Sequence, residues 1–106
     1  MSTVIETDVE QRSEDELAKR YHVIILNDEE HSFDYVIEML QAIFKFPFPT
    51  AFARTLEAHN TGSAIVYTCG LEEAENKRDQ IHAYGPDWRM PNSRGPVTAL
   101  VEPAGT

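Results

Sequence analysis

The sequence has little cysteine, no long hydrophobic run and few positive charges. Its single cysteine, Cys69, excludes an internal disulfide, and no stretch approaches the ~20 apolar residues of a membrane-spanning helix. The first residues also lack the basic and apolar regions of a secretory signal. We therefore expect a cytoplasmic protein.

The scarcity of positive charge restricts the possible partners. Nine Lys and Arg residues against 18 Asp and Glu residues give a formal net charge of -9 at pH 7. Nucleic acids and anionic membranes bind cationic surfaces, so neither is expected as a partner. The 106 residues, of which 42% are hydrophobic, suffice for one small domain with one core.

The first twenty residues differ in composition from the rest. Residues 1–20 are rich in acidic side chains and contain few apolar ones after Val9. Too little apolar surface is available there to offset the conformational entropy lost on ordering. We expect residues 1–20 to form a mobile acidic N-terminal extension and residues 21–104 to form the folded domain.

Hydrophobic patterns predict the elements of that domain. A β-branched run predicts a buried strand over residues 21–26, and apolar residues at three- and four-residue spacing predict a helix over residues 33–44 with Ser32 as its N-cap. Prolines in residues 46–49 end this helix. The remaining elements are a helix over residues 50–60, a strand over residues 64–67, a helix over residues 71–84 and a strand over residues 97–102.

The order β-α-α-β-α-β predicts an α+β fold in which three helices pack on one face of a three-stranded sheet. In the second helix, Phe52, Leu56 and His59 share one face, which we expect to be the apolar face toward the core. A lone histidine on such a face is usually a core histidine. Gly62, just beyond the helix, is a plausible C-cap.

Polar residues are concentrated between the first strand and the first helix, in a segment that we call the elbow: Asn27, Asp28, Glu29, Glu30 and His31. One interpretation is a metal or acid–base site, which together with His59 would make a small hydrolase. However, adjacent loop residues rarely converge on a cation, and no known metal-ligand spacing is present. A structural turn, in which Asp28 bonds nearby backbone amides, is the simpler interpretation.

Cys69 offers a second catalytic possibility, with His59 as its base, but Cys-Gly carries no recognisable local signature. A different interpretation follows when the elbow is considered with the helices. Asn27, Asp28 and His59 can converge at the rim of a pocket whose wall is formed by the apolar faces of the first two helices.

Several segments at coherent spacing support this interpretation: VIILND at residues 23–28, YVIEML at 35–40, LEAH at 56–59, GSA at 62–64 and EEAENK at 72–77. Together they resemble the ClpS family, the adaptors of ATP-dependent Clp proteases. The match runs without a gap from about residue 21 to residue 84 and resumes at Pro96.

The resemblance implies a non-enzymatic adaptor without metal or cofactor. It would bind N-degrons, proteins with a destabilising bulky hydrophobic N-terminal residue, and deliver them to a ClpA- or ClpC-type AAA+ unfoldase and its protease. The positions that match the family's α-amino site are Asn27, Asp28 and His59. A protonated α-amino group offers donors and positive charge to such acceptors. A further alternative keeps the fold and modulates the unfoldase without binding N-degrons.

The implied side-chain pocket departs from the common family pattern. Its positions are His31, Phe33, Thr55, Ala58 and Val97, where the family more often has Thr, Met, Met, Val and Leu. Several of these changes reduce side-chain volume, although Phe33 would refill some space. We expect a pocket that keeps Phe, Tyr and Trp and holds Leu less well, since each unfilled methylene forfeits about 0.8 kcal/mol.

The resemblance also implies a docking surface for the unfoldase at Glu72 and Lys77, on the solvated face of the third helix. The acidic extension matches a family segment thought to engage the unfoldase during substrate transfer. The loop over residues 85–95 is longer than in the usual family member and contains Trp88 and Met90. This loop extends the rim of the pocket, forms a contact with a partner, or covers the small core; the sequence leaves these three alternatives open.

Overall fold

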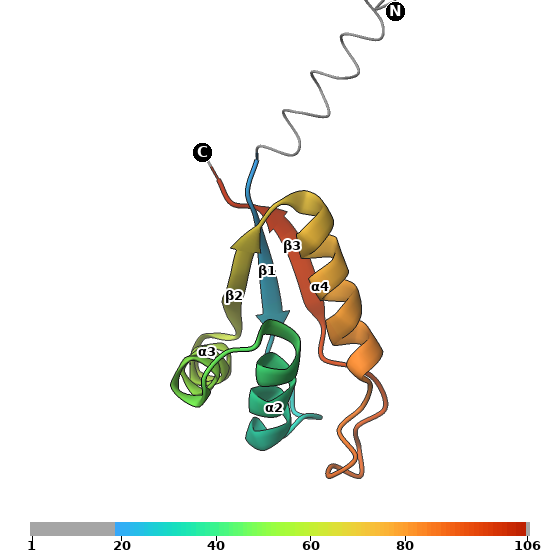
Figure 1. The fold of residues 1–106 in the computed structure, drawn as a ribbon. Coiled ribbons are helices and arrows are strands. Elements are labelled where there is room, and N and C mark those ends of the chain that lie inside the picture. Colours follow the sequence, from blue (N-terminus) through green and yellow to red (C-terminus); the bar gives the residue numbers. More distant parts are fainter. Residues whose placement is uncertain (1–18, 106) are drawn as a thin grey trace, which may run out of the picture.

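A three-stranded antiparallel sheet forms the frame of the computed structural model, which describes residues 19–105 (Figure 1). Its strands are β1 (Tyr21–Leu26), β2 (Ser63–Cys69) and β3 (Ala99–Pro103), in the order β2-β1-β3. Residues 1–18 of the predicted acidic extension lie outside the described residues, so the extension stays a prediction. No helix within residues 19–105 has the length and apolar character needed to cross a bilayer.

The central strand β1 has one buried face. Tyr21, Val23 and Ile25 are buried, whereas the residues that alternate with them are only half-buried. Helix α4 (Leu71–Tyr84) lies across the sheet, while α2 (Phe33–Phe44) and α3 (Phe48–Thr61) lie at the end where β1 finishes (Figure 1). This arrangement confirms the predicted α+β fold of three helices and a three-stranded sheet.

The caps of α2 and α3 explain where these helices begin and end. The Ser32 hydroxyl accepts a hydrogen bond of 3.2 Å from the Tyr35 amide, which confirms the predicted N-cap. Pro47 is the N-cap of α3 and Pro49 lies in its first turn, where a missing N–H costs nothing. The proline segment therefore starts the second helix as well as ending the first. Gly62 is the C-cap of α3, as predicted, and adopts a left-handed conformation with φ of 97°.

The face of α3 toward the core was predicted wrongly. Phe52 and Leu56 are 40% and 39% exposed, and His59 is exposed as well, whereas the buried residues are Ala51, Thr55 and Ala58. Small side chains allow α3 to pack closely against its neighbours. The large apolar residues are left on the outer surface, where Phe48 stacks on Phe52 with ring centroids 5.9 Å apart.

Candidate functional site

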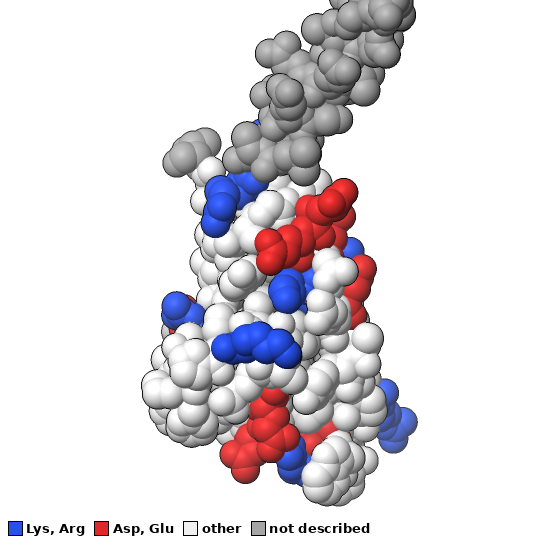
Figure 2. Space-filling model, in the orientation of Figure 1, with Lys and Arg blue, Asp and Glu red and all other residues white. Residues whose placement is uncertain are grey.

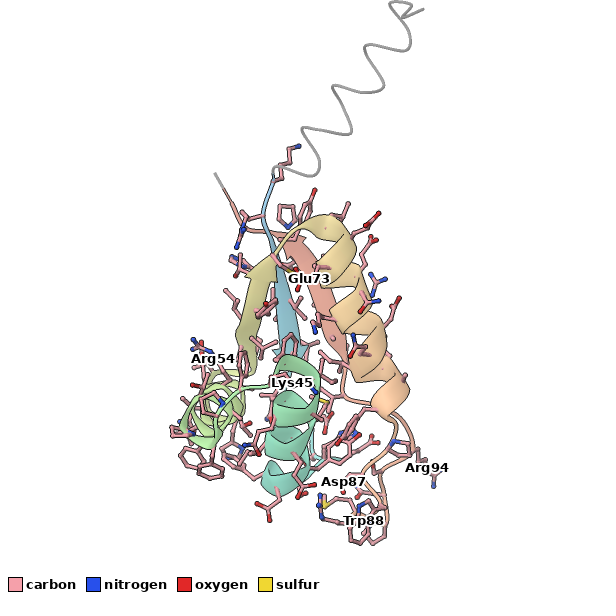
Figure 3. All side chains as sticks on the ribbon, in the orientation of Figure 1. Lys45, Arg54, Glu73, Asp87, Trp88 and Arg94 are labelled. Atoms are coloured by element: carbon pink, nitrogen blue, oxygen red, sulfur yellow. The ribbon has the colours of Figure 1, made fainter. Side chains whose placement is uncertain are left out.

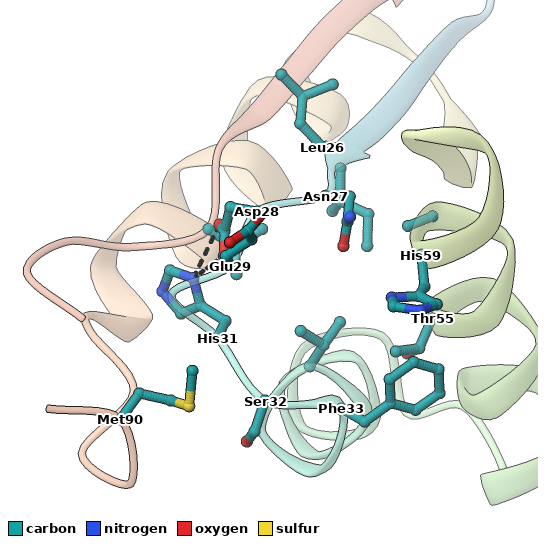
Figure 4. A pocket seen from close by; sticks show the side chains of 14 residues that line it. Leu26, Asn27, Asp28, Glu29, His31, Ser32, Phe33, Thr55, His59 and Met90 are labelled. Carbon is teal, nitrogen blue, oxygen red and sulfur yellow. Dashed lines mark hydrogen bonds and ion pairs between the residues drawn. The ribbon is translucent and has the colours of Figure 1, made fainter. Parts of the chain in front are cut away.

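A cavity of about 460 Å³ opens where β1 ends, between the elbow, α2 and α3 (Figure 4). This volume is within the range of roughly 300–1,000 Å³ found for small-ligand pockets. All the residues that the sequence assigns to substrate binding line it: Asn27, Asp28, His31, Phe33, Thr55, Ala58, His59 and Val97. The fold therefore brings together positions from three separate stretches of the chain.

Backbone hydrogen bonds hold the elbow in place. The Leu26 amide donates to the Thr98 carbonyl at 3.0 Å, and the Asn27 amide donates to the Gly62 carbonyl at 2.9 Å. The second bond joins the elbow to the C-cap of α3. Because His59 lies in the last turn of α3, this bond places it across the cavity mouth from Asn27 (Figure 4).

Asp28 forms the structural turn considered from the sequence and remains accessible from the cavity. Its Oδ1 atom accepts a hydrogen bond of 2.8 Å from the Glu30 amide, which is the expected structural turn. Its side chain is nevertheless 31% exposed and lines the cavity. Nδ1 of His31 lies 2.8 Å from Oδ1 and 2.9 Å from Oδ2 of the same carboxylate. The carboxylate is therefore fixed in orientation and still accessible.

Asn27 and His59 present polar atoms without protein partners. Within the part of the chain that the structure describes, neither side chain makes a hydrogen bond, and both point toward the open space at the cavity mouth (Figure 4). The His59 ring packs edge-on against Phe33, with centroids 5.5 Å apart. His59 is thus an exposed pocket residue, and the interpretation as a core histidine is wrong.

The deeper part of the cavity is apolar. Ile25, Ala58 and Val97 are buried and line it together with Thr55. The Thr55 hydroxyl donates to the Ala51 carbonyl at 2.8 Å, so its proton is used within α3. The arrangement combines polar acceptors at the mouth with a mainly hydrophobic interior.

The sequence did not reveal how the loop after α4 joins this site. Asp87 is 1% exposed, and its carboxylate accepts hydrogen bonds from the amides of Ser32 at 2.6 Å and Arg89 at 3.0 Å. Burial alone would raise the pKa of the Asp87 carboxyl, but these hydrogen bonds and the Arg89 charge leave it below the ordinary value. Met90, in the same loop, lines the cavity. In the sequence, this arrangement is indicated locally by Asp87 alone, since an aspartate in a loop often accepts a hydrogen bond from the amide two residues later, as it does here from Arg89.

The two predicted docking residues lie in different environments. Glu72 is exposed in the first turn of α4, where Figure 2 shows acidic side chains gathered at the upper end of that helix. Lys77 is partly buried, because its Nζ atom donates to the Ile43 carbonyl at 3.0 Å and lies 5.5 Å from the centre of the Phe44 ring. The expectation that Lys77 is on the solvated face is therefore wrong.

The structure does not assemble the cysteine–histidine pair. Cys69 is opposite Tyr21 in the β1–β2 ladder, whereas Ser63, next to the end of α3 that carries His59, is opposite Leu26. The two side chains lie at opposite ends of the strands. Burial, and then Glu73, raise the pKa of the Cys69 thiol, which makes the nucleophilic thiolate scarcer. Among residues 19–105, no three His, Cys, Asp or Glu side chains are grouped to hold a metal ion.

Comparisons with known proteins identify the family of this chain. The family model described as ATP-dependent Clp protease adaptor protein ClpS matches residues 16–91. The adapter protein ClpS of Nautilia profundicola is 38% identical over 80 residues, covering 76% of this chain and 78% of that protein. The ClpS of Wolinella succinogenes is 32% identical over 84 residues, covering 79% and 78%.

A solved structure also matches the fold. The structure of Agrobacterium tumefaciens ClpS2 bound to L-phenylalaninamide has a TM-score of 0.69 and 29% sequence identity, covering 80% of this chain and 96% of that one. Sequence family, relatives and fold agree over most of the chain. This protein belongs to the ClpS family of adaptors of the ATP-dependent Clp protease.

Proposed function

We propose that this ClpS protein binds polypeptides with a free α-amino group and a bulky hydrophobic first residue, and delivers them to a Clp AAA+ unfoldase. The observation that carries the proposal is the set of accessible acceptors, Asn27, Asp28 and His59, at the mouth of a mainly apolar cavity. The ClpS family is a family of adaptors, so its members act with a Clp protease partner.

The mouth suits a protonated amine. An α-ammonium group carries three N–H donors, and the Asp28 carboxylate, the Asn27 amide oxygen and an unprotonated nitrogen of His59 are matching acceptors. Hydrogen bonds to charged groups contribute about 1.5–3 kcal/mol each. An acetylated or internal residue has no charge and keeps a single N–H, so most of these acceptors would lose their partners when the peptide covers them.

The interior suits a large apolar side chain. Burying a Leu- or Phe-sized side chain among Ile25, Ala58 and Val97 is worth roughly 1.5–3 kcal/mol. The related ClpS2 was solved with L-phenylalaninamide, a ligand with a free α-amino group and an aromatic side chain. The acceptors at the mouth of this cavity are complementary to such an α-amino group, and its apolar interior is complementary to such a side chain.

The test is a calorimetric titration with matched peptides that begin with Phe, with or without N-acetylation. We expect binding of the free peptide, loss of binding on acetylation, and at least about tenfold weaker binding in Asp28→Ala. Glu75→Ala, an exposed acid on α4, is the matched control and should bind as the wild type does. Equal affinity for free and acetylated peptides would refute the proposal.

Thermal stability separates the hydrolase alternative from the adaptor. A Phe-initiated peptide should raise the melting temperature, because a ligand that binds only the folded state stabilises it. Added Zn²⁺ or Mg²⁺ should not. The modulator alternative predicts instead that neither ligand raises the melting temperature while the unfoldase still binds.

A further inference from the structure

The His31 ring lies between two hydrogen-bond acceptors. Its Nδ1 atom is 2.8 Å from Oδ1 of Asp28, and its Nε2 atom is 2.8 Å from the Gly95 carbonyl oxygen. The side chain is only 3% exposed. The sequence assigned His31 to the wall for the substrate side chain, but these contacts use both ends of its ring.

The two contacts require a specific protonation state. A carboxylate and a backbone carbonyl accept hydrogen bonds and donate none, so each ring nitrogen must carry a proton. A neutral imidazole satisfies only one of the two acceptors. The Ser93 hydroxyl, 3.5 Å from Nε2, is too distant to replace the Gly95 contact.

Gly95 belongs to the loop over residues 85–95, and His31 anchors this loop to the elbow, where the Arg94 amide also donates to Glu30 at 3.3 Å and the Asn92 side chain to the Glu29 carbonyl at 3.5 Å. A further anchor is Asp87, which accepts a hydrogen bond from the amide of Ser32, the N-cap of α2, at 2.6 Å. Met90 lies between these anchors in the sequence and lines the cavity (Figure 4). The position of Met90 therefore depends on these anchors.

We propose that His31, protonated on both nitrogens, is a positioning residue that fixes the Asp28 carboxylate for the α-amino group and holds the loop over residues 85–95 as a wall of the same cavity. This inference rests on the proposed function. It makes the loop, through Met90, a part of the specificity site. Because the His31 ring contacts both Asp28 and the loop, binding of the α-amino group and the position of the loop depend on each other.

The groups around the ring are compatible with its positive charge. They are the Asp28 carboxylate from the elbow, the Gly95 carbonyl from the loop and the Tyr35 ring from α2, whose centroid lies 5.1 Å from that of His31. Arg94 approaches through its backbone amide, which donates to Glu30 at 3.3 Å. Burial raises the pKa of Tyr35 to about 12, so this neighbour is neutral at physiological pH.

Two substitutions separate the two contacts. His31→Asn places a donor near the position of Nδ1 and can keep the Asp28 contact, whereas His31→Gln reaches toward the position of Nε2 and can keep the Gly95 contact. His31→Ala removes both. His22→Asn is the matched control, because His22 lies in β1 and contacts Thr68 at 2.8 Å, away from the cavity.

Two readouts are needed, and both use the full chain. One is the affinity for a peptide that begins with Phe. The other is the fluorescence anisotropy of Trp88, the single tryptophan of the chain, which is 82% exposed in the loop beside Arg89 (Figure 3). We expect His31→Gln to bind peptide about tenfold more weakly with normal anisotropy. His31→Asn should bind within about threefold of wild type but with lower anisotropy, and His31→Ala should lose both.

The two readouts together provide the decisive comparison. If His31→Asn and His31→Gln both retain wild-type values of peptide affinity and of Trp88 anisotropy, the inference is wrong. The anisotropy measured without peptide tests the loop anchor even if no peptide binds, so failure of the proposed function is recognised separately.

Discussion

The Lys77 ammonium group on α4 donates a hydrogen bond of 3.0 Å to the Ile43 carbonyl near the end of α2. This carbonyl is one of the last four in the helix, which have no partner within the helix, and a positive charge there also interacts favourably with the helix dipole. Lys77 therefore joins two helices. Of the two predicted docking residues, Lys77 thus makes a contact between helices that Glu72 does not make.

We accordingly expect Lys77→Ala to lower the free energy of unfolding by about 1–2 kcal/mol, measured by urea denaturation. Glu72→Ala should leave it within about 0.5 kcal/mol of wild type, as is usual for exposed positions. If Glu72 contributes to docking, Glu72→Ala should weaken binding to the N-terminal domain of a ClpA- or ClpC-type unfoldase. Unchanged stability of Lys77→Ala would show that the Ile43 contact contributes little.

Asp87 should make the fold sensitive to acid. Its pKa is lowered in the folded state, so its stabilisation is present above the ordinary carboxyl value of about 3.9 and is lost as the pH falls through the lower folded value. Asp87→Asn should lose roughly 2–3 kcal/mol at pH 7, with a smaller difference from wild type at pH 2–3. Melting temperatures across this range test the prediction. Asp79→Asn, at an exposed position, should show neither effect.

Tyr35 should have the opposite effect, at alkaline pH. Its hydroxyl donates to the Gly85 carbonyl, and burial followed by the charges of Tyr84, Asp87 and Asp28 raise its pKa to about 12. Between about pH 10 and pH 12 the unfolded chain ionises at this position and the folded one does not, so up to roughly 2–3 kcal/mol of stability is lost. Tyr35→Phe should start less stable and lose less over this range. Parallel stability curves for the two proteins would contradict this.

The small wall residues of the cavity should determine which first residues bind. Peptides that differ only in that residue should bind in the order Phe, Tyr or Trp ahead of Leu. Thr55→Met refills the buried wall and should raise the affinity for Leu relative to Trp. Ala53→Met, on the exposed face of α3, is the control and should leave the order unchanged. If Leu binds as tightly as Phe in the wild type, the prediction that the pocket holds Leu less well is wrong.

The acidic extension is predicted to act in delivery and not in recognition. Deleting residues 1–18 leaves Arg20, whose carbonyl accepts a hydrogen bond of 2.9 Å from the Ala104 amide, so the sheet should be unaffected. Peptide affinity should remain at the wild-type value while degradation of a Phe-initiated substrate by unfoldase and protease slows. Normal degradation by the truncated protein would exclude the proposed role.

The sequence predicts best what depends on local patterns. Helix α2 and its Ser32 cap follow from spacing and from a side chain that bonds three residues ahead. The prediction of the buried face of α3 was wrong because the large apolar side chains were taken to point inward. The residues that are buried include Ala51 and Ala58, and alanine gives little indication in the sequence of whether it is buried. Which residues of a helix are buried depends on the helix or strand that packs against it, and the local sequence pattern does not contain this information.

The candidate site shows the same division. The residues assigned to substrate binding through the family resemblance all line one cavity, because the shared fold brings the matched positions together. The contacts of Asp87 with Ser32 and of Lys77 with Ile43 were missed, since they join residues 55 and 34 positions apart. No periodicity or turn preference relates residues at such separations.

The central place of β1 in the sheet has a consequence for folding. This strand is the first in the chain, yet one of its two partners, β3, spans Ala99–Pro103 (Figure 1). Pairings between residues so distant in sequence form slowly, and on the ribosome they wait for the last strand to emerge. The cavity wall at Val97, two residues before the start of β3, is thus completed late in synthesis. A nascent chain has Asn27, Asp28 and His59 before it has a closed pocket.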